Sequence, residues 1–139
     1  MEDLTFGEQV KIVLGRKGMT IKECYEQTGS DYGSILKRFG SESMVRRFAL
    51  KFLKDGSFAE LKKALAEGDG ETAFRAAHAL KGVCLNLGFD RLYEVSEELT
   101  ETLRGHETAG TEALFAKAEE QYDALTDVLR RYEAEEAAI

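Results

Sequence analysis

Glycines and helix-capping residues divide the 139-residue sequence into segments of helical length. Between these breaks, apolar residues recur at spacings of three and four, which places them on one side of a helix. The chain contains no proline, the strongest helix breaker. No long linker or low-complexity stretch separates the segments, and the length suits a single domain. The pattern therefore predicts an all-α chain with one hydrophobic core.

Capping residues mark where the expected helices begin, and glycines mark where they end. Three shorter segments come first, and longer ones joined by short loops follow, which favours an antiparallel (up-down) four-helix bundle with additional short N-terminal helices. The expected short helices cover about 4–14, 20–27 and a stretch that starts at Ser30 or Asp31 and carries Phe39. Further helices are expected after caps at Ser41, Ser57 and Asp90, over 71–87 with a stop at Gly88, and from Thr111 past Tyr132, and four of these are long enough for the bundle.

Acidic residues exceed basic ones and give a net charge of −7. Binding to nucleic acid or to an anionic membrane depends on clustered positive charge, so the composition argues against both. The sequence has no apolar run long enough for a membrane span and no signal-peptide pattern at its start, so we expect a cytoplasmic protein. Cys24 and Cys84 lie far apart without metal-ligand spacing, which favours free buried thiols over a disulfide or a zinc site.

The helix expected over 71–87 presents a histidine to solvent. Its small and apolar residues form one stripe, which we expect to be buried: Ala73, Ala76, Ala77, Leu80, Val83, Cys84 and Leu87. Residues of an α-helix are rotated by about 100° each, so His78 stands about 160° from Leu80. The imidazole is therefore expected on the exposed side, together with Arg75, Lys81, Gly82 and Leu85.

The run from His78 to Gly88 reads His-Ala-Leu-Lys-Gly-Val-Cys-Leu-Asn-Leu-Gly. It resembles the signature of histidine phosphotransfer (HPt) domains, in which a histidine, then Leu-Lys-Gly, then a glycine ten residues after the histidine recur. The resemblance covers roughly residues 19–130. We accordingly assign 19–135 to an HPt domain and 1–18 to an N-terminal extension that is expected to be helical. Further residues that follow the family's order are Asp31-Tyr32, Arg38-Phe39-Gly40, Gly68-Asp69, Ala76-Ala77, Leu92, Leu99 and Leu103.

The resemblance implies a phosphorelay carrier. An exposed neutral imidazole is a nucleophile near neutral pH. His78 would accept a phosphoryl group from the aspartyl phosphate of one receiver domain and pass it to the aspartate of another. The implied partners are receiver domains of response regulators or hybrid histidine kinases. Mg²⁺ is expected on the partner receiver and no tightly bound cofactor on this chain. No ATP-binding motif is present, so we expect a phosphocarrier rather than an autonomous kinase.

Four further residues of this face have expected roles, each beside an ordinary alternative. Lys81 could neutralise phosphoryl charge or be a surface lysine. Gly82 costs about 0.5–1 kcal/mol in a helix relative to alanine and could keep the imidazole accessible or allow close helix packing. Arg75 could contact a partner or be a solvated cation. Leu85 stands where the family commonly has a small residue, and it could be a partner contact or a solitary surface apolar residue.

One other interpretation of the sequence remains open, and another is disfavoured. The chain could be a helical adaptor that docks and sequesters a receiver without carrying phosphate, because the same exposed stripe would serve. A metal-binding bundle would need several convergent ligands, and the sequence shows no such histidine spacing. His106 lies in a polar, glycine-rich connection and is interpreted as a loop residue.

Overall fold

The structure, a computed structural model, describes residues 18–137, and within that range the chain is helical and has no strand. The predicted all-α class is therefore confirmed, whereas the helix predicted over 4–14 lies outside the described residues. The elements are α2 (Ile21–Gln27), α3 (Tyr32–Phe39), α4 (Glu42–Lys51), the 3₁₀ turn η1 (Phe52–Lys54), α5 (Ser57–Ala66), α6 (Gly70–Leu87), α7 (Asp90–Thr102) and α8 (Glu112–Ala137).

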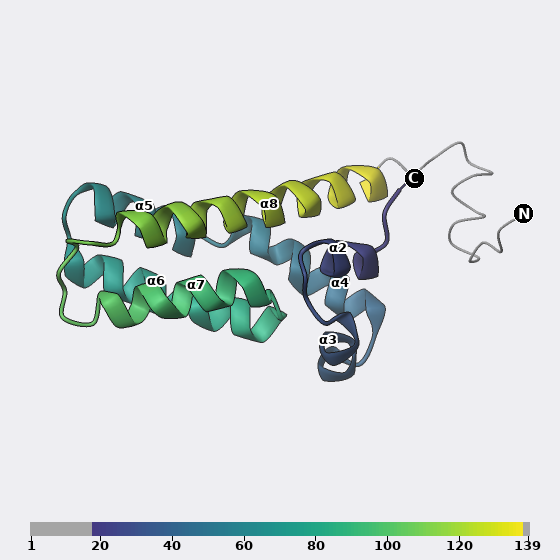
Figure 1. Cartoon of the computed structure of the whole chain (residues 1–139). Coiled ribbons are helices and arrows are strands. Elements are labelled where there is room, and N and C mark those ends of the chain that lie inside the picture. The colour runs from purple at the N-terminus through teal and green to yellow at the C-terminus, as the bar shows by residue number, and fades with distance from the viewer. Residues whose placement is uncertain (1–17, 138–139) are drawn as a thin grey trace, which may run out of the picture.

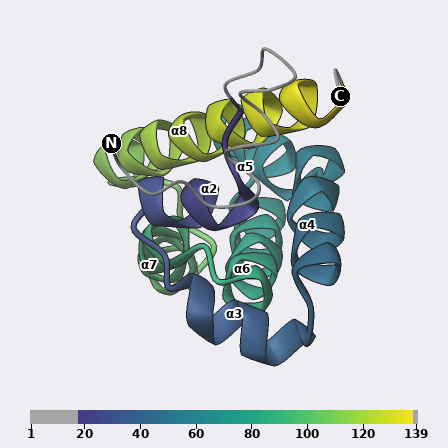
Figure 2. The same cartoon turned by 90° about the vertical axis from the view of Figure 1, so that its right-hand side faces the viewer.

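Helices α5, α6, α7 and α8 run alongside one another through most of the molecule (Figure 1). α6 packs most extensively against its sequence neighbours α5 and α7, and α7 also packs against α8. The shorter α2 and α3 gather with α4 at one end, the end that faces the viewer in Figure 2. α2 packs there against α8, and α4 packs against α6 and α8. α6 is thus held from several sides, while one of its faces stays uncovered.

One cluster of buried side chains joins the described helices. α6 contributes small residues that allow close approach of its neighbours. Its buried members are those of the predicted stripe: Ala73, Ala76, Ala77, Leu80, Cys84 and Leu87. Val83 was predicted to be buried with them, but it is only half-buried at the edge of the core. The two ends of the described chain are tied together, because the backbone N–H of Met19 donates to Glu135 Oε2 over 2.7 Å.

The helix start at Asp90 differs from the prediction. Asp90 is the first residue of α7, its N-cap is Phe89, and no side chain of that N-cap bonds to the helix. The hydroxyl of Ser30 instead accepts the Asp90 N–H over 3.4 Å. Ser30 was one of two candidates for the α3 cap, and the other one, Asp31, takes that role by accepting the N–H of Ser34 over 3.3 Å.

The predicted cap of α5 is also wrong, whereas that of α4 is confirmed. Ser57 is the first residue of α5 and Gly56 is its N-cap, without a side-chain bond. The N–H of Ser57 donates to the carboxylate of Asp55 over 2.9 Å, so an acid two residues earlier does what the serine was expected to do. At α4, the hydroxyl of Ser41 accepts the N–H of Met44 over 3.3 Å.

The two cysteines are buried and free, as predicted. Burial raises the pKa of the Cys24 thiol to about 12 and raises that of Cys84 as well, so both thiols stay protonated at neutral pH. Cys84 belongs to the core side of α6, opposite the exposed face. In the range 18–137, no helix has the length and apolar character that a membrane crossing requires.

Candidate functional site

His78 lies near the middle of α6 on the face that no other helix covers. Its side chain is exposed, whereas Leu80 two residues later is fully buried, in agreement with the helical phase. No side chain or backbone group among residues 18–137 hydrogen-bonds to either nitrogen of its ring. The imidazole can therefore offer a lone pair to an incoming electrophile without first breaking a bond within the protein.

A row of residues one turn apart leads from the buried start of α6 to its exposed face: Gly70, Phe74, His78 and Gly82. The ring centroids of Phe74 and His78 are 6.2 Å apart at an angle of 26°, which is an offset stack. One turn beyond the histidine, a Cβ placed on Gly82 would meet nothing within 4 Å among the described residues. Close packing of another helix therefore does not explain this glycine. Side chains of a helix lean toward its N-terminus, so a side chain at Gly82 would lie over the imidazole.

Lys81 is half-buried on the side of α6 that faces α7. Within residues 18–137 it forms no ion pair or hydrogen bond, so its ammonium is available to a ligand. It lies close enough to act on Glu101 of α7. The hydrogen bond from Arg104 lowers the pKa of the Glu101 carboxyl, and the charges of Arg104 and Lys81 lower it further. Lys81 of α6 and Arg104, two residues after the end of α7, thus both act on the same carboxylate.

Arg75 and Leu85 also lie on the exposed face. Arg75 pairs with Glu71 one turn earlier over 3.4 Å, and both side chains are about two-thirds exposed, at 65% and 64%. Such an exposed pair contributes little to stability and exchanges easily for a partner's charge. Leu85 is 50% exposed, and no other large hydrophobic side chain in the range 18–137 is exposed. Leu85 lies two turns after His78, and a single exposed apolar side chain is ordinary on a protein surface.

The end of α6 is held in place by groups from the N-terminal helices. The guanidinium of Arg38 donates to the carbonyls of Leu85 and Asn86, both over 2.9 Å. The buried hydroxyl of Tyr25 donates to the carbonyl of Leu87 over 2.7 Å. The Leu85 carbonyl also accepts the N–H of Gly88 over 3.3 Å. The carbonyls of Asn86 and Leu87 lie in the last turn, where no further helical N–H follows, so α2 and α3 supply their hydrogen-bond donors.

The glycine that follows α6 completes this end. Gly88 has a φ of 73°, the left-handed conformation that a C-terminal helix cap requires. A Cβ at this position would also run into the side chain of Ile35. The prediction that Gly88 stops the helix is therefore confirmed, and α3 packs closely against the stop.

Three further residues here were not identified from the sequence: Phe74, which lies beside His78, and two residues that lie against Phe74. Phe74 contacts the imidazole, the guanidinium of Arg104 lies 5.5 Å from the Phe74 ring centre, and the ring of His106 lies 5.6 Å from it. The spacing of four residues between Phe74 and His78 was a readable signal. No sequence signal placed Arg104 or His106 there, because both come from the connection that follows α7.

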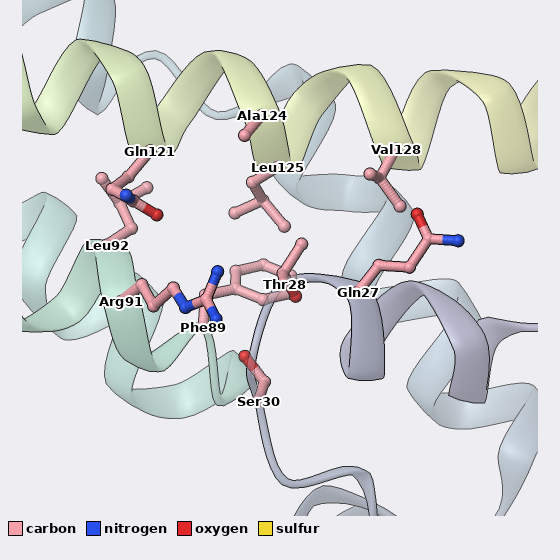
Figure 3. Close-up of a pocket in the computed structure, with 10 residues that line it drawn as sticks. All are labelled: Gln27, Thr28, Ser30, Phe89, Arg91, Leu92, Gln121, Ala124, Leu125 and Val128. Carbon is pink, nitrogen blue, oxygen red and sulfur yellow. The ribbon is translucent and has the colours of Figure 1, made fainter.

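No three His, Cys, Asp or Glu side chains gather as metal ligands within the described part of the chain. A small pocket lies elsewhere, between the end of α2, the start of α7 and the middle of α8, and Arg91 and Phe89 are among its lining residues (Figure 3). None of the predicted site residues lines it. The chemistry of this molecule is therefore best sought on the open face of α6.

In a comparison with known protein families, the family model described as Hpt domain matches residues 55–134. This range starts just before α5, runs through α6 with His78 and ends inside α8. No match was found among curated proteins, and none among solved structures.

Proposed function

The chain belongs to the Hpt domain family, and from this premise we propose that His78 is the residue that carries the phosphoryl group. Members of this family are phosphocarriers of two-component signalling rather than kinases. The single observation that supports His78 most strongly is its place on α6. Its side chain is exposed and accepts or donates no hydrogen bond among residues 18–137, and one turn later Gly82 has free space around the position of a Cβ.

The proposed step is an in-line displacement at phosphorus. The unprotonated ring nitrogen of His78, proposed to be Nε2, attacks the phosphoryl group of a receiver's aspartyl phosphate. The P–N bond forms as the P–O bond to the aspartate breaks, and the aspartate leaves as a carboxylate. The other ring nitrogen keeps its proton. The reverse displacement, by the aspartate of a second receiver, releases the phosphoryl group from the histidine.

The neighbours of His78 have separate proposed roles in this step. Lys81 stabilises the negative charge of the phosphoryl oxygens, since its ammonium is one turn away and has no partner among residues 18–137. Gly82 leaves the line of attack open. Arg75 and Leu85 lie at the edges of the face and contact the docked receiver. The chain itself supplies the nucleophile and the docking surface. Mg²⁺ is expected on the receiver, and no tightly bound cofactor is expected on this chain.

The proposed partners are receiver domains of response regulators or hybrid histidine kinases, in the cytoplasm where such receivers act. We also propose that α5 to α8 form the antiparallel four-helix bundle predicted from the sequence, since each packs on its neighbour and short turns join α5 to α6 and α6 to α7. The proposed domain extends over 19–135, beyond the family match. The bond between Met19 and Glu135 supports this extent because it joins the two ends of that range.

A transfer experiment tests the proposal. The purified chain is mixed with radiolabelled phosphorylated receivers from its own source, and label is followed into an acid-labile, base-stable adduct. A second, unphosphorylated receiver is then added to collect the label. We expect label to enter this chain and leave it again. If receivers bind the chain but no receiver transfers label to it, the carrier proposal is wrong and the sequestering adaptor is supported instead.

A further inference from the structure

We propose that Phe74 is a positioning residue for His78, and that His106 and Arg104 hold Phe74 in place. In this arrangement the loop between α7 and α8 sets the orientation of the reacting imidazole. The inference rests on the proposed phosphoryl transfer at His78. It adds that the packing of Phe74 determines which side of the imidazole a receiver can reach.

The loop between α7 and α8 contacts the start of α6. Gly70, the first residue of α6, has no room for a side chain because the backbone carbonyl of His106 occupies the space where a Cβ would lie. His106 has a φ of 64°, which few residues other than glycine adopt. Its backbone N–H donates to the carbonyl of Leu103 over 2.8 Å. The loop is thus seated on α6 one turn before Phe74.

The side chains of His106 and Arg104 form a clamp on Phe74. This half-buried ring packs against the core, with the His106 ring at 5.6 Å and the Arg104 guanidinium at 5.5 Å from its centre. Arg104 is itself directed by its ion pair with Glu101 over 2.7 Å. A cation over an aromatic face and a tilted aromatic pair are both attractive arrangements. Phe74 is therefore restrained by two side chains that come from outside α6.

The ring of Phe74 in turn orients the imidazole of His78. No group of residues 18–137 hydrogen-bonds to the ring of His78, so its orientation depends on packing. Side chains of a helix lean toward the N-terminus, and for His78 that direction leads to the ring of Phe74, with centroids 6.2 Å apart. The other side, toward Gly82, is open. Phe74 thus closes one side of the imidazole and Gly82 opens the opposite one to the receiver.

The geometry is tested in the unphosphorylated chain by NMR of the His78 ring protons. The Phe74 ring shifts their resonances if the two rings stack, so Phe74→Leu should displace them and Phe74→Tyr should leave them close to the wild-type position. Phe115→Leu is the matched control, because it also removes one ring of a stacked pair, with Phe58 at 5.5 Å between α8 and α5. Unchanged His78 resonances in Phe74→Leu overturn the inference.

The role in transfer is tested with a phosphorylated receiver. An aromatic pair contributes enough that Phe74→Leu should slow transfer about two- to tenfold, with Phe74→Tyr restoring it. His106→Ala should slow transfer too. It should have no further effect when combined with Phe74→Leu, because His106 acts through the Phe74 ring. An unchanged rate in Phe74→Leu, or independent effects of the two changes, overturns the inference. If the wild-type chain accepts no label, the proposed function is wrong. The NMR experiment still tests the position of Phe74 in that case, because it uses the unphosphorylated chain.

Discussion

Replacement of Gly82 by glutamine should make the protein more stable and less active. The residue lies inside α6 with open space around the position of a Cβ, so a side chain fits without a clash. Glycine is about 0.8–1 kcal/mol less favourable than alanine in a helix, and glutamine is one of the better helix formers. Gly82→Gln should therefore raise the free energy of unfolding by about 0.5 kcal/mol. For a domain of this size, that corresponds to about 2 °C in the unfolding midpoint.

The same change should obstruct transfer. A side chain at Gly82 leans toward the N-terminus and covers the side of His78 that the receiver needs. We expect the rate from a phosphorylated receiver to fall about tenfold or more, which equals about 1.4 kcal/mol in the barrier. The opposite signs of the two effects separate steric access from damage to the fold.

Thermal unfolding and a single-turnover transfer assay measure the two effects on the same samples. Ala116→Gln serves as control, because it adds the same side chain at an exposed position of α8. The control should transfer at the wild-type rate. Wild-type transfer by Gly82→Gln would refute the steric reasoning, and a marked loss of stability would show that the glycine serves packing instead.

Three other changes have expected outcomes. Tyr25→Phe removes the buried bond to the Leu87 carbonyl and should lower the free energy of unfolding by about 1–2 kcal/mol in urea titrations, with transfer kept. Lys81→Gln should slow transfer about fivefold without a change in the unfolding midpoint, because one partly exposed charge beside the phosphoryl group is worth about 1 kcal/mol. Hydrogen bonds from the hydroxyl and backbone N–H of Thr72 lower the pKa of Asp69 below its ordinary 3.8. The ionised carboxylate therefore stabilises the fold at pH values above 3.8, and this stabilisation is lost as the pH falls through the lowered pKa. Asp69→Asn should therefore lose less stability than wild type when unfolding midpoints are compared between neutral and strongly acidic pH.

The helical class and the face of α6 were predictable because both follow from local periodicity. The alternation of small apolar residues with polar ones around α6 fixes which side is buried, and the His78 position follows from the angle between residues. Ser41 and Gly88 were predictable for a similar reason, since a cap depends on a residue's own backbone and its nearest neighbours.

Features that depend on tertiary contacts were not predictable. Ser30 bonds to the start of α7 rather than to α3, and Asp55 satisfies the N–H of Ser57, so each group found a different partner from the one that sequence order suggests. The clamp on Phe74 joins the end of α7 and its loop to α6. Nothing local to His106 indicates that contact, because its cause is the packing of the two helices.

The most direct test of the central claim is to locate the phosphoryl group. The chain has only two histidines, His78 and His106, so His78→Gln and His106→Gln each leave one candidate. After reaction with a phosphorylated receiver, mass spectrometry of peptides kept at alkaline pH should place the group on His78 in the wild type and in His106→Gln. His78→Gln should carry none. A phosphoryl group on His106, or full labelling of His78→Gln, would contradict the account.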